Sequence, residues 1–172
     1  MPTLGKEAVD AALDAWAAHI ADNHPKGGGK LAIIGLISHG DNLAQRLIIR
    51  LEKRGISALY GALDISLYRD DFDMKQSKPA LRSSYLPFST DGLELILVDD
   101  VVQTGRTVRA ALNAIFEYGR PAGVELHCLV DRGGRQLPIQ PDYCALQISA
   151  PTDAKVAVRL LETDGCDAII HP

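Results

Sequence analysis

The residues whose types and spacing could do chemistry are two adjacent carboxylates, Asp99 and Asp100, which follow the apolar run LELILV at 93–98. The turn QTGRT at 103–107 comes directly afterwards and leads into a segment with helical periodicity. Buried like charges repel each other, so a strand end with a purely structural role should avoid such a pair. The pair therefore predicts a site where a hydroxyl-rich or cationic group lies against the carboxylates.

The turn at 103–107 has the features of a phosphate-binding turn. Gly105 permits close approach of the backbone, and the free N–H groups of the next helix point outward with the positive end of the helix dipole behind them. Thr104 and Thr107 add hydroxyl donors. A phosphorylated ribose would satisfy both halves of the motif, with its 5′-phosphate in the turn and its 2′- and 3′-hydroxyls on the carboxylates.

The same arrangement suits displacement at ribose C1, which passes through a state resembling an oxocarbenium ion. Carboxylates in a fixed geometry stabilise that cation more than the neutral ground state. Two other interpretations are a solvated strand end or helix cap, and a phospho-acceptor receiver domain whose acidic pair holds magnesium. A receiver would place the pair near the chain start and would have no use for the turn, so the sugar-phosphate interpretation is favoured.

The elements that must position these groups alternate along the chain. Helical periodicity covers 6–22, 41–54 and a segment that follows the turn and is stopped by Gly119 and Pro121. Strand-like runs cover 31–37, 58–68, 93–98, 124–131 and 143–149, and the C-terminal residues are expected to add further strands. This alternation predicts one α/β domain over residues 1–172, with a mostly parallel sheet and a ligand site beyond the carboxyl ends of its strands.

Composition limits the classes of function. The chain has 172 residues, 47% hydrophobic and 23% charged, with a net charge of −4, which is ordinary for a globular protein and argues against non-specific nucleic-acid binding by the whole chain. Cys128, Cys144 and Cys166 lack CxxC spacing and are expected to be small buried thiols rather than disulfide partners or zinc ligands. No apolar run approaches about 18 residues, so we expect a cytoplasmic protein without a membrane span.

Residues 96–108, ILVDDVVQTGRTV, resemble the phosphoribosyl-pyrophosphate (PRPP) signature of type I phosphoribosyltransferases. The segments GALDISLYRDDF (61–72), ALNAIFEYGRPAGVEL (111–126) and LVDRGGRQLPIQPDY (129–143) resemble the PyrR family, whose members are attenuation regulators of pyrimidine operons and uracil phosphoribosyltransferases. The resemblance implies an α/β type I phosphoribosyltransferase fold: a central, mostly parallel twisted sheet flanked by helices. It also implies a small hood from about 129–143 and the C-terminal strands, and a flexible lid at about 69–92.

The resemblance also implies roles for residues. Asp99 and Asp100 would contact the ribose hydroxyls as the catalytic pair. The PRPP-binding turn would comprise Val101, Val102, Gln103, Thr104, Gly105, Arg106 and Thr107. The pyrophosphate loop would comprise Ser38, His39 and Gly40, the lid would supply Arg69 and Arg82, and the base would lie under Asp131, Arg132 and Val156. Magnesium would arrive with PRPP, without direct protein ligands.

Two departures from the family pattern carry expectations of their own. His39 stands where the family commonly has arginine, and a histidine that is mostly neutral at pH 7 predicts weaker or pH-dependent pyrophosphate binding, with a gain of activity in His39→Arg. The first helix offers Asp10, Asp14 and Asp22 on the stretch where RNA-binding members carry basic and hydroxyl residues. Acidic side chains there weigh against binding of an mRNA leader.

The leading hypothesis is an enzyme that makes UMP from uracil and PRPP. Three alternatives stay open: an RNA-binding attenuation regulator that responds to UMP, a phosphoribosyltransferase for another base such as guanine or hypoxanthine, and a nucleotide sensor with little catalysis. The resemblance also implies a homo-oligomer, either a dimer or a larger assembly.

Overall fold

A five-stranded parallel sheet forms the centre of the computed structural model, which describes residues 3–24, 30–66, 68, 83–151 and 154–172. Its strands lie in the order β3-β2-β4-β5-β6. They are β2 (Leu31–Leu36), β3 (Leu59–Leu63), β4 (Glu94–Val102), β5 (Gly123–Asp131) and β6 (Tyr143–Gln147). The strands pair in parallel throughout, which confirms the predicted sheet.

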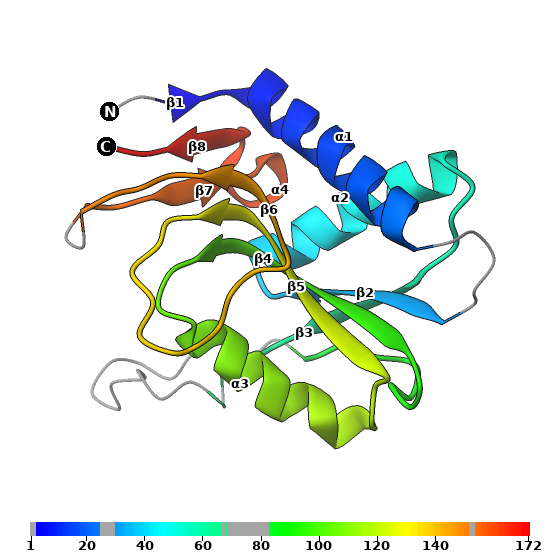
Figure 1. The fold of residues 1–172 in the computed structure, drawn as a ribbon. Helices are drawn as coiled ribbons and strands as arrows, with labels where there is room; N and C mark the ends of the chain where they lie inside the picture. Colours follow the sequence, from blue (N-terminus) through cyan, green and yellow to red (C-terminus); the bar gives the residue numbers. More distant parts are fainter. Residues whose placement is uncertain (1–2, 25–29, 67, 69–82, 152–153) are drawn as a thin grey trace.

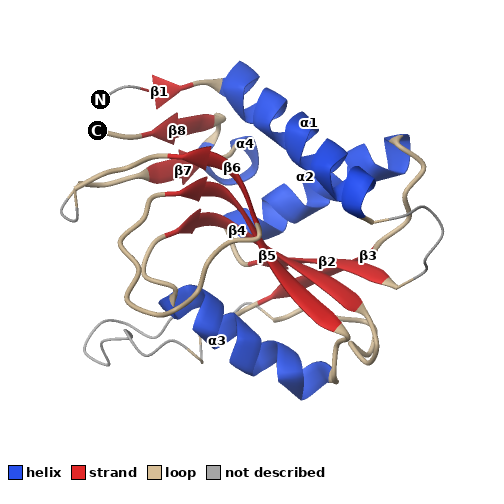
Figure 2. Ribbon diagram, in the orientation of Figure 1, coloured by secondary structure: helices blue, strands red, loops and turns tan. Residues whose placement is uncertain are grey.

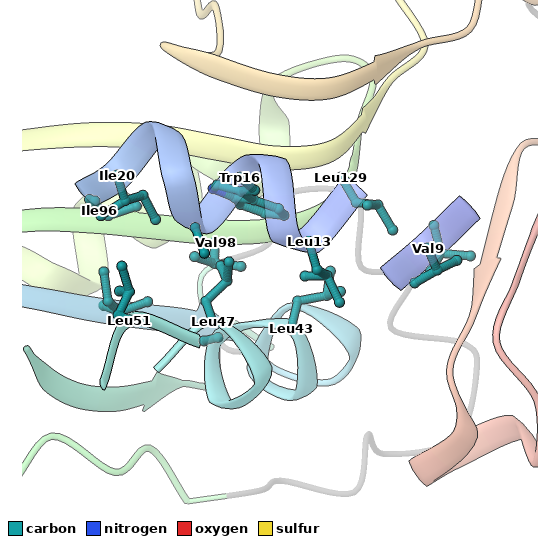
Figure 3. Close-up of a cluster of buried hydrophobic side chains, with 14 of the residues drawn as sticks. Val9, Leu13, Trp16, Ile20, Leu43, Leu47, Leu51, Ile96, Val98 and Leu129 are labelled. Atoms are coloured by element: carbon teal, nitrogen blue, oxygen red, sulfur yellow. The ribbon is translucent and has the colours of Figure 1, made fainter. Parts of the chain in front are cut away.

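Helices cover both faces of this sheet. On one face lie α1 (Lys6–Asn23) and α2 (His39–Lys53), and on the other lies α3 (Arg106–Ile115), which a 3-10 turn (Phe116–Tyr118) extends (Figure 1, Figure 2). Figure 3 shows how the first pair packs: Leu13, Trp16 and Ile20 of α1 lie over Leu43, Leu47 and Leu51 of α2, beside Ile96 and Val98 of β4. All eight side chains are fully buried, so this cluster anchors α2 and with it the residues at its first turn.

A second, antiparallel sheet of three strands lies beside the carboxyl ends of the main sheet. It has the order β1-β8-β7 and consists of β1 (Thr3–Leu4), β8 (Ala168–Ile170) and β7 (Ala157–Arg159), with the short helix α4 (Leu161–Asp164) between β7 and β8. We call these elements the hood sheet. The C-terminal strands were expected, whereas the pairing of β1 with β8 was not. The hood was expected to include residues from about 129, whereas residues 129–131 belong to β5 of the main sheet.

The strand that carries the acidic pair is longer than the apolar run indicates. The prediction ended it at residue 98, whereas β4 continues to Val102 because β5 stays paired beside it, with Asp99 opposite Cys128 and Val101 opposite Val130. Asp99 and Asp100 therefore lie inside a strand. Conversely, the strand predicted at 58–68 ends at Leu63.

The three thiols occupy different environments. Cys128 is buried, Cys144 is half-buried and Cys166 is exposed, and all three are free. The expectation of buried thiols was therefore wrong for Cys166, which follows Gly165 at the end of α4, where the chain turns at the surface. Separately, none of the helices in the described part of the chain is long and apolar enough to cross a membrane.

A buried histidine joins α1 to the sheet. The Nδ1 atom of His127 accepts a hydrogen bond from Trp16 Nε1 at 2.9 Å, and its Nε2 lies 2.9 Å from a carboxylate oxygen of Glu125. The rings of His19 and Tyr143 stack beside it. Because Nδ1 accepts the tryptophan proton, the imidazole is neutral, and burial lowers the pKa of His127 to about 4.

This histidine predicts a loss of stability in acid. Between its ordinary pKa of 6.5 and its folded value of about 4, His127 binds a proton in the unfolded chain but not in the folded chain. Its contribution to the free energy of unfolding is therefore fully present above pH 6.5 and is lost as the pH drops toward 4. The loss from this one group should reach about 3 kcal/mol below pH 4. Chemical denaturation across this pH range should show that the free energy of unfolding falls less steeply with decreasing pH in His127→Gln than in the wild type. An equal pH dependence in the two proteins would contradict the view that His127 is neutral in the folded chain.

Candidate functional site

Asp99 and Asp100 line two separate cavities at the carboxyl end of β4. Successive side chains of a strand point to opposite faces, so two adjacent carboxylates in β4 diverge. Asp99, 6% exposed, lines a cavity of about 290 Å³, and Asp100 lines another of about 650 Å³. The two cavities share Val101 and Val156 and are therefore neighbours. The strand's alternation is what allows the like charges to be adjacent in sequence.

The smaller cavity brings together most of the residues that the sequence placed at a sugar phosphate. Its lining comprises Asp99, Val101, Val102, Gln103, Thr104, Gly105, Arg106, Thr107, Val108, Arg132 and Val156. Gly105 has φ +88° and caps the N-terminus of α3, which begins at Arg106. The N–H groups of that first helical turn, together with the hydroxyls of Thr104 and Thr107, make this end of the cavity a site for an anion.

The loop between β5 and β6 supports the turn from behind. Gln136 N and Leu137 N both donate to the carbonyl oxygen of Thr104, at 3.0 and 3.2 Å. Arg135 Nη1 donates to the carbonyl oxygen of Gln103 at 2.8 Å, and Arg106 Nε donates to the side chain of Gln136 at 3.0 Å. These bonds attach the carbonyl groups of Gln103 and Thr104 to the supporting loop, and within the turn the Arg106 N–H donates to Thr104 Oγ1 at 3.3 Å.

Arg132 places a buried positive charge in the smaller cavity. The residue is 8% exposed, its Nη2 donates to the carbonyl oxygen of Pro151 at 2.9 Å, and its Nε has no hydrogen-bond partner among the described residues. A buried guanidinium is costly unless an anion or a polar group meets it. The neighbouring Asp131 lines neither cavity, because its carboxylate pairs with Arg135 Nη2 at 2.7 Å and accepts the Gly133 N–H.

The residues expected to form the pyrophosphate loop pack directly on β4. A cis peptide bond joins Ile37 and Ser38, and α2 begins at His39, two residues before the start of the helix predicted over 41–54. A Cβ atom built on Gly40 would lie 2.4 Å from the carbonyl oxygen of Val98 and 3.2 Å from Asp99 Cα. Only a glycine permits this approach, which brings the first turn of α2 against β4.

His39 lies between carboxylates from two distant parts of the chain. Its Nδ1 is 3.3 Å from Asp100 Oδ2, and its Nε2 is 2.9 Å from Asp164 Oδ2 on α4. Hydrogen bonding to Asp100, and next to Asp164, raises the pKa of His39 to about 9 against the opposing effect of burial. The expectation of a mostly neutral histidine at pH 7 was therefore wrong, because sequence could not show the two partners.

Several residues of the larger cavity had no place in the predicted site. It is lined by His39, Asp100, Val101, Lys155, Val156, Ala157, Val158, Arg159, Asp164 and Ile170. Asp164 lies 125 positions from His39, and no local motif marks it. Arg69 and Arg82, the lid residues of the prediction, lie outside the described residues.

The resemblance implies magnesium that arrives with PRPP, without direct protein ligands. Within the described ranges there is no group of three or more histidine, cysteine, aspartate or glutamate side chains that could hold a metal ion. Magnesium prefers oxygen ligands, keeps several waters and commonly binds through substrate phosphates.

Comparisons of the sequence place the chain among characterised families. Residues 5–163 match the phosphoribosyl transferase domain family. The bifunctional protein PyrR of Akkermansia muciniphila is 52% identical over 164 residues, covering 95% of this chain and 91% of that protein. Bifunctional protein PyrR of Deinococcus radiodurans is 44% identical, covering 96% of this chain and 91% of that protein.

Comparisons of the structure give the same fold. Hypoxanthine phosphoribosyltransferase of Trypanosoma cruzi, solved in complex with the product IMP, superposes with a TM-score of 0.72 at 19% identity over 97% of this chain and 87% of that one. A hypoxanthine phosphoribosyltransferase of Staphylococcus aureus gives a TM-score of 0.67 at 16% identity, covering 87% of this chain and 79% of that one. At these identities the likeness concerns the fold alone.

Proposed function

The chain belongs to the phosphoribosyltransferase family, and within it to the PyrR proteins, and on that premise we propose that it transfers the phosphoribosyl group of PRPP to uracil, giving UMP and pyrophosphate. The observation that carries the proposal is the cavity in which Asp99 and the turn at 103–107 meet. One end of it suits an anion and the other presents a carboxylate, as a 5-phosphorylated ribose requires.

The two neighbouring cavities suggest how PRPP would lie. Its 5′-phosphate would occupy the amide groups at the start of α3, and its pyrophosphate would extend into the larger cavity toward His39, Lys155 and Arg159. The ribose would then cross the shared wall at Val101, where the two carboxylates of β4 diverge. Its adjacent hydroxyls can donate to Asp99 on one side and to Asp100 on the other.

The chemistry follows from these positions. Loss of pyrophosphate from ribose C1 leaves positive charge on the ring, and two carboxylates held by a paired strand stabilise it without reorganising. The protonated His39 faces the side where negative charge accumulates on the leaving group. Magnesium, which the family generally uses with PRPP, would neutralise part of the charge of the pyrophosphate.

The base would enter beside the hood. Val156 borders both cavities, and Arg132 contributes its buried guanidinium to the smaller one. A flat apolar wall and a few fixed polar groups are what a small heterocycle needs for orientation. Asp131 acts indirectly in this proposal, since its bond to Arg135 fixes the loop that supports the phosphate turn.

The contacts of the basic residues on the face formed by α1 and α2 weigh against RNA recognition at this face. Arg50, a candidate for contacting RNA phosphates, is bound to Asp10 at 3.0 Å and to Asp14 at 2.8 Å. Arg54 donates to the carbonyl oxygen of Asp14 at 3.4 Å. RNA affinity depends on cations that neutralise phosphates, and the cation at Arg50 is already neutralised by protein carboxylates.

The proposed activity can be tested by offering one base at a time. With PRPP and magnesium, uracil should yield UMP, while guanine and hypoxanthine should yield nucleotide at least about a hundredfold more slowly, because a site that hydrogen-bonds one base leaves its polar groups unpaired with another. Chromatographic separation of the products measures both rates. Faster formation of GMP or IMP would replace uracil in the proposal with a purine.

The product assay, combined with a measurement of UMP binding, distinguishes an enzyme from a nucleotide sensor. Calorimetry with UMP should show binding to the protein that also turns over uracil. Binding of UMP without any nucleotide formation from PRPP would contradict the catalytic proposal and indicate a nucleotide sensor.

A further inference from the structure

Each ring nitrogen of His39 faces a carboxylate. Nδ1 faces Asp100 Oδ2 at 3.3 Å, and Nε2 faces Asp164 Oδ2 at 2.9 Å with Thr163 Oγ1 at 3.1 Å. An ionised carboxylate only accepts hydrogen bonds, so a ring that carries a proton on both nitrogens suits these two neighbours. This geometry is that of an imidazolium, and it links the end of β4 to the hood sheet.

Asp164 is held in place independently of the histidine. Its Oδ2 accepts the backbone N–H of Leu160 at 2.9 Å and the hydroxyl of Thr163 at 2.8 Å. Its helix, α4, is in turn attached to α2 through Arg46, which donates to Glu162 at 2.6 Å and to Asp167 at 2.8 Å. The carboxylate therefore meets His39 at a position fixed before any ligand arrives.

The charged groups around His39 come from four elements. Asp100 faces it from β4, and Asp164 from α4. Arg159 of β7 and Lys155, which precedes that strand, line the same cavity, and Asp41 on α2 itself is bound by the hydroxyl of Tyr60. Of the two carboxylates that contact the His39 ring, Asp164 is the one that does not belong to the proposed ribose site.

We propose that Asp164 is a positioning residue that holds His39 as a cation at the pyrophosphate end of the site. When the ribose hydroxyls engage Asp100, His39 loses one of its two counter-ions and keeps the other. Its second N–H then faces the incoming pyrophosphate. A titratable histidine thereby performs the task of a permanently charged residue, because the hood supplies the carboxylate that keeps it charged. This inference rests on the proposed function.

The test compares Asp164→Asn with the wild type and with Asp22→Asn, the same change at an exposed position near the C-terminal end of α1. In the wild type, kcat/KM for PRPP should decline above about pH 9, where His39 loses its proton. In Asp164→Asn the decline should move to lower pH by about one unit or more, because an opposite charge near the imidazole is lost. Asp22→Asn should keep the wild-type profile.

Two further measurements make the result decisive. The imidazole of His39, followed by NMR without substrate, should titrate at lower pH in Asp164→Asn than in Asp22→Asn. In the His39→Arg background, Asp164→Asn should no longer move the pH profile, since a guanidinium does not titrate in this range.

The outcomes distinguish the inference from the proposed function. An unchanged NMR titration of His39 in Asp164→Asn would overturn the inference even if UMP forms normally. A shifted titration, with no nucleotide formed from PRPP by the wild type at any pH, would contradict the proposed function while leaving the pairing of Asp164 with His39 intact. A shifted titration together with a shifted kinetic profile supports both.

Discussion

Replacing both Asp99 and Asp100 with asparagine should lower kcat for UMP formation about a thousandfold or more, the range seen when a fixed group that stabilises transition-state charge is removed. Asparagine keeps the shape of aspartate and can still hydrogen-bond a hydroxyl. It carries no charge, so it cannot favour the cation that develops on the ribose ring. The loss should therefore fall on kcat more than on KM for PRPP.

The matched control lies on the same strand. Glu94→Gln removes one negative charge at the opposite, exposed end of β4 and should leave both constants unchanged. Because Asp99 is buried and Asp100 more open, the two single variants should also differ, with Asp99→Asn the more damaging to stability. Wild-type kinetics in the double variant would remove the role assigned to the pair.

Replacing Gly40 with alanine should damage both binding and stability. The new Cβ would lie 2.4 Å from the carbonyl oxygen of Val98 and 3.2 Å from Asp99 Cα, and neither backbone atom belongs to a flexible side chain. The first turn of α2 must then move off β4, carrying His39 away from Asp100. We expect a loss of about 1–3 kcal/mol in the free energy of unfolding, as for other overpacked positions, and a rise in KM for PRPP.

Denaturant titration and steady-state kinetics measure the two effects of Gly40→Ala. Gly5→Ala serves as the kinetic control, since the nearest atom to its added Cβ is a side-chain oxygen of Glu7 at an ordinary 3.7 Å. An unchanged KM in a destabilised Gly40→Ala protein would show that the position of the α2 N-terminus does not matter for PRPP.

The parts of the site that could be predicted are those encoded locally. The acidic pair and the turn at 103–107 lie in one short stretch whose residue types specify a strand, a glycine-dependent turn and a helix start. The parallel sheet follows from the alternation of apolar runs and helical periodicity. Each of these signals operates over a few residues, so the chain displays it without reference to its fold.

The parts that escaped prediction depend on contacts between distant segments. The length of β4 beyond residue 98 depends on continued pairing with β5, and the charge of His39 depends on Asp164, 125 residues away. The strand at Thr3–Leu4 is too short to be recognised alone and exists because β8 pairs with it. Such features arise from tertiary structure and leave no pattern in a window of sequence.

The pairing of β4 with β5 has a consequence for how this protein can tolerate change. The carboxylates of Asp99 and Asp100 reach their two cavities because Asp99 lies opposite Cys128 and Val102 opposite Asp131. A shift of β4 by one residue relative to β5 would exchange the two faces of the strand, so each carboxylate would point away from its own cavity and toward the other. An insertion or deletion of one residue between 94 and 102 should therefore abolish activity even when every functional amino acid is still present. In the proposed mechanism, the register of β4 against β5 therefore matters as much as the two aspartates themselves.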